Sequence, residues 1–239
     1  MKKTEGVFIV CKTNSLIEAN YQLNLVEQRI LLACIAKIDS RKPLPAEITF
    51  TAHEYAAIYK TPLNYAYEAL KNGTEQLHTR TLEPRREDGT RGSAIHWLRS
   101  PVVRHEWEGA VTLQFSKEVK PHLTMLSRCF TEYELEKIAH LQSTHSLRLY
   151  ELLISWRRKG LMAVTIEDFR LRLGLEGRYQ KFKHLKNDVI NPAIEELRRK
   201  AGLEIEWEVK KRGRTVVSLA FQFHEKALKS SKLLRFPGN

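Results

Sequence analysis

The stretch that most restricts the fold is an amphipathic basic helix followed directly by a hairpin. The helix is marked by apolar residues three or four positions apart, namely Phe182, Leu185, Val189, Ala193 and Leu197. The positions between Phe182, Leu185 and Val189 include lysines, so the face of the helix opposite the apolar residues is basic. Two alternating strands follow over residues 203–209 and 215–221, and the turn between them reads Lys-Arg-Gly-Arg. A basic helix followed by a basic-tipped hairpin is typical of a winged-helix domain that binds DNA.

The charge of the chain supports this interpretation. The 239 residues carry a formal net charge of +12, which favours a nucleic-acid partner, with an anionic membrane surface as the weaker alternative. Residues 1–120 hold 17 Lys and Arg against 14 Asp and Glu, a net +3, whereas residues 121–239 hold 23 against 14, a net +9. The second half is therefore expected to dominate the attraction to phosphate.

The same order of elements is predicted twice. In the second half, a long helix, a strand and a short helix precede the basic helix, at residues 143–159, 162–165 and 166–173. In the first half, a long helix, a strand and two further helices are expected at residues 24–39, 47–51, 51–59 and 64–77. Strands should follow at residues 80–84, 93–98 and 110–115. A repeated order of elements indicates a duplicated unit.

The boundary between the two units is placed near residue 130, just ahead of a charged helix expected over residues 132–137. The predicted fold class is α+β, with two tandem winged-helix domains at residues 1–130 and 131–239. The second domain is expected to end in a short basic tail that begins at residue 227.

Two groups of residues resemble a known family, the iteron-binding replication initiators of theta-replicating bacterial plasmids. The first is Asn-Ser-Leu-Ile-Glu-Ala-Asn-Tyr at residues 14–21, with Leu23, Leu25 and the run Glu-Gln-Arg-Ile-Leu-Leu at residues 27–32. The second comprises Tyr179, Phe182, Lys183, the run at residues 189–197, the hairpin turn at residues 211–214 and Phe221. The resemblance covers roughly residues 10–224, and its first group is the more specific one.

The resemblance implies two winged-helix domains and a role in plasmid replication. Monomers of this family bind directly repeated origin sequences, called iterons, and the origin is then opened for the host initiator and the replicative helicase. Dimers, in equilibrium with monomers and held mainly through the first domain, often bind an inverted repeat and repress the initiator's own gene. The first domain would then contact the DNA backbone and dimerise, while the second would be the main reader of DNA.

The basic helix supplies most of the candidate DNA-binding residues. Lys, Arg, Asn and Gln side chains read base edges in the major groove, and the N-terminal residues of a recognition helix reach them. Pro192 should kink or interrupt the helix, which confines base contacts to its first turns. The candidates that face outward or lie at the N-terminal end are Arg178, Tyr179, Gln180, Lys181, Lys183, His184, Lys186 and Asn187. The alternative is a solvated basic face, and for His184 an unremarkable surface histidine.

The remaining candidates are expected to contact the DNA backbone. Lys211, Arg212 and Arg214 at the hairpin tip suit phosphate or the minor groove, although a turn can also be charged for solubility alone. In the first domain the candidates are Lys71 on the helix at residues 64–77 and, in the expected wing, Arg85, Arg86 and Arg91. Two glutamates on that helix make it the weaker reader of DNA. The alternative is that the same exposed surface serves dimerisation.

Enzyme chemistry is not expected. The sequence has no Gly-Lys-Ser or Gly-Lys-Thr phosphate loop and no pair of histidines around one apolar residue, the spacing expected of rolling-circle nicking enzymes. Its three cysteines are odd in number and widely spaced, so neither a disulfide framework nor a zinc site is predicted. No catalytic site or cofactor is expected either. With no signal peptide or membrane-spanning run, a bacterial cytoplasmic location is expected. The competing function is a dimeric winged-helix repressor without a replication role, and a rolling-circle enzyme comes third.

Overall fold

The computed structural model describes residues 8–226, so the predicted basic tail lies outside the described residues. The first part of the chain contains β1 (Ile9–Thr13), α1 (Asn14–Ile17), β2 (Asn20–Tyr21), α2 (Leu25–Ala36), β3 (Ile48–Thr51), α3 (Ala52–Tyr59), α4 (Leu63–Thr74), η1 (Leu77–Thr79), β4 (Thr81–Glu83), β5 (Ile95–His96), β6 (Val103–His105), η2 (Glu106–Glu108), β7 (Ala110–Leu113) and η3 (Lys120–His122). The rest contains β8 (Phe130–Glu134), α5 (Glu136–Ala139), α6 (Thr144–Ser155), β9 (Leu161–Thr165), α7 (Ile166–Arg172), α8 (Phe182–His184), the π-helical turn η4 (Leu185–Ile190), α9 (Asn191–Lys200), β10 (Leu203–Arg212) and β11 (Thr215–Glu225).

The repeated order predicted from the sequence is confirmed. In the first unit β3, α3 and α4 follow one another, and in the second unit β9, α7 and the helical run from α8 to α9 do the same. The capping box at the start of α3 is present, because the Glu54 N–H donates to Thr51 Oγ1 and the Thr51 N–H donates to the Glu54 carboxylate. Each unit closes with an antiparallel three-stranded sheet, in the orders β3-β7-β6 and β10-β11-β9.

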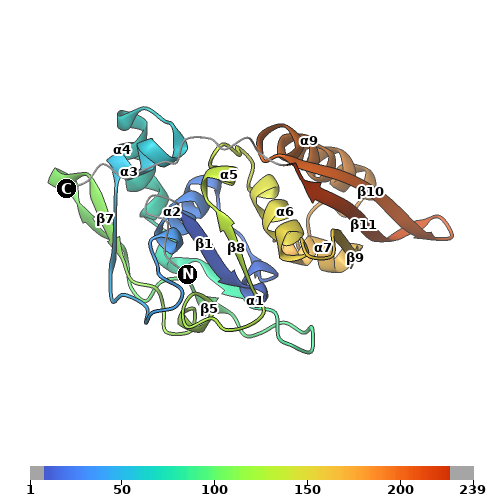
Figure 1. The fold of residues 1–239 in the computed structure, drawn as a ribbon, viewed down its shortest axis with the longest axis horizontal. Helices are drawn as coiled ribbons and strands as arrows, with labels where there is room; N and C mark the ends of the chain where they lie inside the picture. The colour runs from blue at the N-terminus through green and yellow to red at the C-terminus, as the bar shows by residue number, and fades with distance from the viewer. Residues whose placement is uncertain (1–7, 227–239) are drawn as a thin grey trace.

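The wing of the first unit was predicted in the wrong place. The strand β6 and its partner β7 form the hairpin of this unit, and the tip is the short turn Glu106-Trp107-Glu108. The turn at residues 85–91 instead joins β4 to β5, in a separate sheet with β2. Figure 1 shows the β6–β7 hairpin and the β10–β11 hairpin at opposite ends of the long axis. A three-residue strand with an acidic turn carries too weak a pattern to be recognised in the sequence.

The charged helix expected over residues 132–137 was also predicted wrongly. Residues 130–134 form β8, which pairs antiparallel with β1, and only Glu136–Ala139 is helical. Glu132 and Glu134 are exposed while Thr131 and Tyr133 are buried, which is the alternation of a strand. The boundary expected near residue 130 coincides with the start of β8 and remains a prediction.

The helical run after Lys181 continues to Lys200, although Pro192 was expected to kink or interrupt it. A proline removes one N–H donor and crowds the carbonyl four residues earlier. Here the preceding turn is widened into the π-helix η4, in which the Asn191 N–H donates to the carbonyl of Lys186, five residues back. Pro192 then falls in the first turn of α9, the part of a helix in which proline is best tolerated.

Gly174 marks the place where the two units touch backbone to backbone. Its φ is +66°, and a Cβ added at this position would lie 2.1 Å from the carbonyl oxygen of Tyr21. Gly177 has a similar φ of +74°, but a Cβ added there would meet nothing within 4 Å, which makes this glycine a matched control for the backbone strain.

We expect Gly174→Ala to lower the free energy of unfolding by more than Gly177→Ala does. Both substitutions carry the cost of a left-handed alanine, about 1–3 kcal/mol, but only the first adds a clash with Tyr21. Urea unfolding of both variants measures the difference. Equal losses would mean that the second unit does not rest on the Tyr21 backbone in solution.

Candidate nucleic-acid interface

The predicted basic helix exposes the face that was expected to read DNA. Leu185, Val189 and Ile190 are buried in the core, as are Ala193 and Leu197 further along. The residues on the opposite face are exposed, and they are Lys181, Lys183, His184, Lys186 and Asn187. Asp188 lies on the same face, with its carboxylate 3.6 Å from Nδ1 of His184. The face is therefore basic with one acidic residue that sequence reasoning did not weigh.

The residues just before this helix form an ordered loop. The helix begins at Phe182, so Arg178, Tyr179 and Gln180 precede it. The guanidinium of Arg170, from α7, donates to the carbonyl oxygens of Tyr179 at 3.0 Å and Gln180 at 2.9 Å. Tyr179 does not point outward as expected. It has a φ of +50°, is half-buried, and meets the ring of His145 edge-on with the ring centroids 6.2 Å apart.

Lys186 lies where the basic helix meets the second-unit wing, the hairpin formed by β10 and β11. Its ammonium group is 5.8 Å from the ring centroid of Trp207 on β10, within the range of a cation–π contact. Trp207 in turn stacks on Phe221 of β11, with the rings 19° from parallel. The position of Lys186 is thus tied to the base of the wing, and helix and wing form one surface.

The tip of the second-unit wing carries the basic turn predicted from the sequence. Lys211, Arg212 and Arg214 are exposed, and Gly213 with a φ of +61° allows the tight turn between the strands. The pairing of β10 with β11 shifts by one residue after Lys210, so the tip is offset from the rest of the hairpin. These three cations extend beyond the core, where a phosphate backbone could reach them.

The first unit presents a different surface. Lys71 is exposed on α4 as predicted, and Ala66 and Leu70 are buried on its inner face. The wing tip beside it is acidic, and its Trp107 is fully exposed. The surface around α4 and β6 also exposes apolar side chains, namely Tyr65, Tyr67 and Val103.

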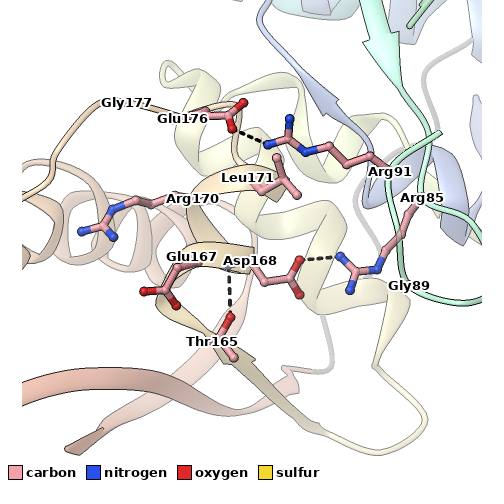
Figure 2. Close-up of a pocket in the computed structure, with 10 residues that line it drawn as sticks. All are labelled: Arg85, Gly89, Arg91, Thr165, Glu167, Asp168, Arg170, Leu171, Glu176 and Gly177. Atoms are coloured by element: carbon pink, nitrogen blue, oxygen red, sulfur yellow. Dashed lines mark hydrogen bonds and ion pairs between the residues drawn. The ribbon is translucent and has the colours of Figure 1, made fainter. Parts of the chain in front are cut away.

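Two of the three arginines predicted in the first-unit wing contact carboxylates of the second unit instead of standing free. Figure 2 shows Arg85 reaching Asp168 and Arg91 reaching Glu176 across the cleft between the β4–β5 hairpin and α7. Arg91 also lies 3.4 Å from the carboxylate of Glu83 on its own hairpin. Arg86 is exposed. Sequence reasoning could not find these partners, because they lie more than 80 residues away.

Four side chains in this cleft form a closed ring of alternating charge, the Glu18–Arg172–Asp168–Arg85 ring. Arg172 contacts Glu18 at 3.1 Å and Asp168 at 2.8 Å. Arg85 closes the ring by contacting Asp168 and, at 3.4 Å, the other oxygen of Glu18. Partial burial alone would raise the pKa of the Asp168 carboxyl, but hydrogen bonds and charge from Arg172 and Arg85 outweigh it and leave the pKa below its ordinary value.

A second charged cluster, the buried hub, lies deeper between the same parts of the chain. It consists of Lys12 on β1 and of Arg148 and Glu151 on α6, each with at most 3% of its surface exposed. Glu151 is the common partner: Lys12 pairs with its carboxylate, Arg148 lies 3.3 Å from the carboxylate, and the hydroxyl of Tyr133 donates a hydrogen bond to it. Burial would raise the pKa of Glu151, yet Lys12 and Arg148 hold it below its ordinary value. The carboxylate thus lies between two basic side chains inside the core.

Arg148 also shows the structural role of residues 14–21, the first group that resembles the family, which we call the N-terminal signature. Its guanidinium donates to the carbonyl oxygen of Ala19 at 2.8 Å, to the hydroxyl of Tyr21 and to the carbonyl oxygen of Arg172 at 2.5 Å. Ala19 and Tyr21 belong to the signature, as does Glu18 of the ring, whereas Arg172 ends α7. The signature is thus the part of the first unit on which the second unit rests.

Neither a cluster of metal-ligating side chains nor a membrane-spanning helix occurs in the described part of the chain. Within residues 8–226, no group of three or more His, Cys, Asp or Glu side chains is placed to hold a metal ion. None of the helices in that range is long and apolar enough to cross a membrane.

Comparison with known proteins identifies relatives along nearly the whole chain. One curated relative is a replication initiation protein of Escherichia coli, which is 28% identical over 223 residues, covering 90% of this chain and 69% of that protein. Another is the PI protein of Escherichia coli, which is 26% identical over 247 residues, covering 88% of this chain and 80% of that protein. A crystal structure of the Pi initiator protein in complex with iteron DNA has the same fold, with a TM-score of 0.80 at 22% identity, covering 94% of this chain and 100% of that one. The family described as Initiator Replication protein, WH1, matches residues 9–154, and Initiator Rep protein, WH2, matches residues 165–223. The chain therefore belongs to the family of plasmid replication initiator proteins with two winged-helix domains.

Proposed function

We propose that this initiator binds the iterons of its plasmid origin through the second-unit helix and wing together. The observation that carries the proposal is the contact of Lys186 with Trp207, which joins the exposed basic face of the helix to the hairpin whose tip carries exposed cations. In this proposal the helix face reads base edges, the wing tip neutralises phosphates, and α4 with Lys71 approaches an adjacent groove. The Pi initiator, which has the same fold, was crystallised with iteron DNA, which supports the assignment.

The proposed mechanism is positional and needs no catalytic step by this chain. Phosphate neutralisation supplies affinity, and contacts with base edges set the register along the DNA. Binding to neighbouring iterons would then help to open the origin for the host initiator and the replicative helicase.

We propose further that a homodimer, in equilibrium with the monomer, represses the initiator's own gene at an inverted repeat. The support is the first-unit surface, where Val103 and Trp107 are exposed beside β6, an edge strand of its sheet. Exposed apolar groups beside an unpaired strand edge favour association with a second chain. The tip of this wing is acidic, so the tip itself suits a protein partner better than phosphate, while Lys71 on α4 remains the first-unit contact with DNA in the monomer.

We expect Lys186→Ala to weaken binding to an iteron by about 1–3 kcal/mol while changing binding to random DNA much less. Lys186 is held at the helix–wing junction, where its ammonium group can meet a base edge in the major groove. Fluorescence anisotropy with iteron and random duplexes measures both affinities. An equal loss on both duplexes would make Lys186 a phosphate contact.

Footprinting of the purified protein on the DNA upstream of its own gene tests the function as a whole. Protection of direct repeats supports iteron binding, and protection of an inverted repeat alone supports a repressor without a replication role. A plasmid carrying only the candidate origin and this gene separates the two further, because only an initiator would maintain it.

A further inference from the structure

The Glu18–Arg172–Asp168–Arg85 ring joins the two halves of the molecule symmetrically. Glu18 and Arg85 lie in the segment matched by the first winged-helix domain, and Asp168 and Arg172 lie in the segment matched by the second. Two ion pairs of the ring cross the junction, Arg85 with Asp168 and Arg172 with Glu18. Arg91 and Glu176 add a further pair at 2.5 Å on the outer side.

A single short helix, α7, connects the ring to the basic helix, which is predicted to read DNA and is called the reading helix below. Asp168 and Arg172 are both on α7, and the next residues lead into the loop before Phe182. Arg170, between them on α7, points away from the ring and holds the carbonyl groups of Tyr179 and Gln180 in that loop. One side of α7 is therefore fastened to the first unit, and its other side is fastened to the start of the reading helix.

Arginine forks paired with carboxylates are directional contacts, and their geometry constrains orientation as well as distance. The Arg85–Asp168 pair is only partly buried, with 23% and 20% of its side chains exposed, so this pair alone would stabilise the fold weakly. The Arg172–Glu18 pair is more buried, with 9% and 15% exposed. Two of the four ion pairs cross the junction, and the other two hold the paired side chains within each unit, so the closed ring nevertheless opposes rotation of one unit against the other. We therefore expect the ring to act mainly on the relative orientation of the two units, and only slightly on the free energy of unfolding.

We propose that the ring fixes the angle between α4 and the second-unit reading helix, and thereby selects the number of base pairs between the two halves of an iteron. This proposal rests on the proposed function, in which both units approach one DNA duplex. B-DNA completes a turn in about 10.5 base pairs, so one added base pair rotates one half-site against the other by roughly 34°. A protein with a fixed angle between its units rejects that rotation, and a protein with a loosened junction tolerates it. Asp168 and Glu18 are then positioning residues that need not touch DNA.

The test compares Asp168→Asn with Glu167→Gln on duplexes carrying the native iteron or the same iteron with one base pair added or removed between its halves. Both substitutions remove one negative charge from the same helix, but Glu167 points away from Arg85 and Arg91. The N-cap of α7 is retained, because Thr165 accepts from the Asp168 backbone N–H. We expect the wild type and Glu167→Gln to bind the native spacing about tenfold tighter than the altered ones, and Asp168→Asn to lose most of that preference.

Glu18→Gln provides a second test from the other side of the junction, and circular dichroism shows whether each variant is folded. The preference between spacings is the decisive reading, since a merely structural loss would lower affinity for all duplexes alike. If folded Asp168→Asn and Glu18→Gln keep the wild-type preference, the proposal is overturned. If the wild type binds the iteron no better than random DNA, the proposed function fails instead.

Discussion

We expect Glu151→Gln to lower the free energy of unfolding by about 3–5 kcal/mol, which is the range for removing one partner of a buried ion pair. For a chain of this length each kcal/mol corresponds to roughly 2–4 °C, so the melting temperature should fall by roughly 10 °C. Thermal and urea unfolding followed by circular dichroism measure both quantities.

The physical reason is the charge balance of the buried hub. Glu151 is the single carboxylate between Lys12 and Arg148, and none of the three has more than 3% of its surface exposed. Glutamine keeps the size of the side chain and can still hydrogen-bond to Tyr133. It leaves two buried cations without an anion, and a buried charge without compensation is the most costly defect a core can hold.

Lys12→Met should be far milder, because it removes one of two cations and leaves a balanced pair of Arg148 with Glu151. Glu167→Gln, which neutralises an exposed carboxylate, should leave the melting temperature unchanged. If Lys12→Met destabilises the protein as much as Glu151→Gln, the stability of the hub does not depend on its charge balance.

Local patterns predicted the elements of this fold well. The helices expected over residues 24–39, 51–59 and 64–77 correspond to α2, α3 and α4, and Thr51 caps α3 at the expected start. These features depend on contacts three or four residues apart, which a single sequence displays. By contrast, β1 and β8 pair across more than 100 residues, so nothing near Glu132 indicated a strand partner.

In the candidate site, too, local sequence predicted some features, and contacts between distant residues determined the others. The exposed face of the basic helix and the wing tip followed from periodicity and turn chemistry, and both are where the sequence placed them. Arg85 and Arg91 were predicted to contact DNA, because the sequence of a charged turn does not show whether its arginines bind phosphate or carboxylate groups. Only the fold shows that Asp168 and Glu176 lie opposite them. For the same reason no role was predicted for Glu18, which contacts Arg85 and Arg172 in the fold.

We expect the triple variant Lys211→Ala, Arg212→Ala, Arg214→Ala to lose affinity for all duplexes and to bind with a weaker salt dependence. The three cations are exposed at the tip of the second-unit wing, and nothing in the described residues ties them to the core. Each phosphate neutralised on B-DNA contributes about 0.9 to the slope of log K against log salt, so the slope should fall in magnitude by about 2.7. Anisotropy titrations at several salt concentrations give the slope for the wild type and the variant.

The matched control removes three exposed cations elsewhere, at Arg157, Arg158 and Lys159 after α6. Both triple variants lower the net charge equally, so they weaken long-range attraction to DNA alike. Only the wing variant should also change the slope, because counterion release requires cations placed against phosphates. Equal slopes for the two variants would mean that the wing acts through bulk charge alone. A slope change combined with an unaltered ratio between iteron and random DNA would separate the wing, as a phosphate clamp, from Lys186 on the helix beside it.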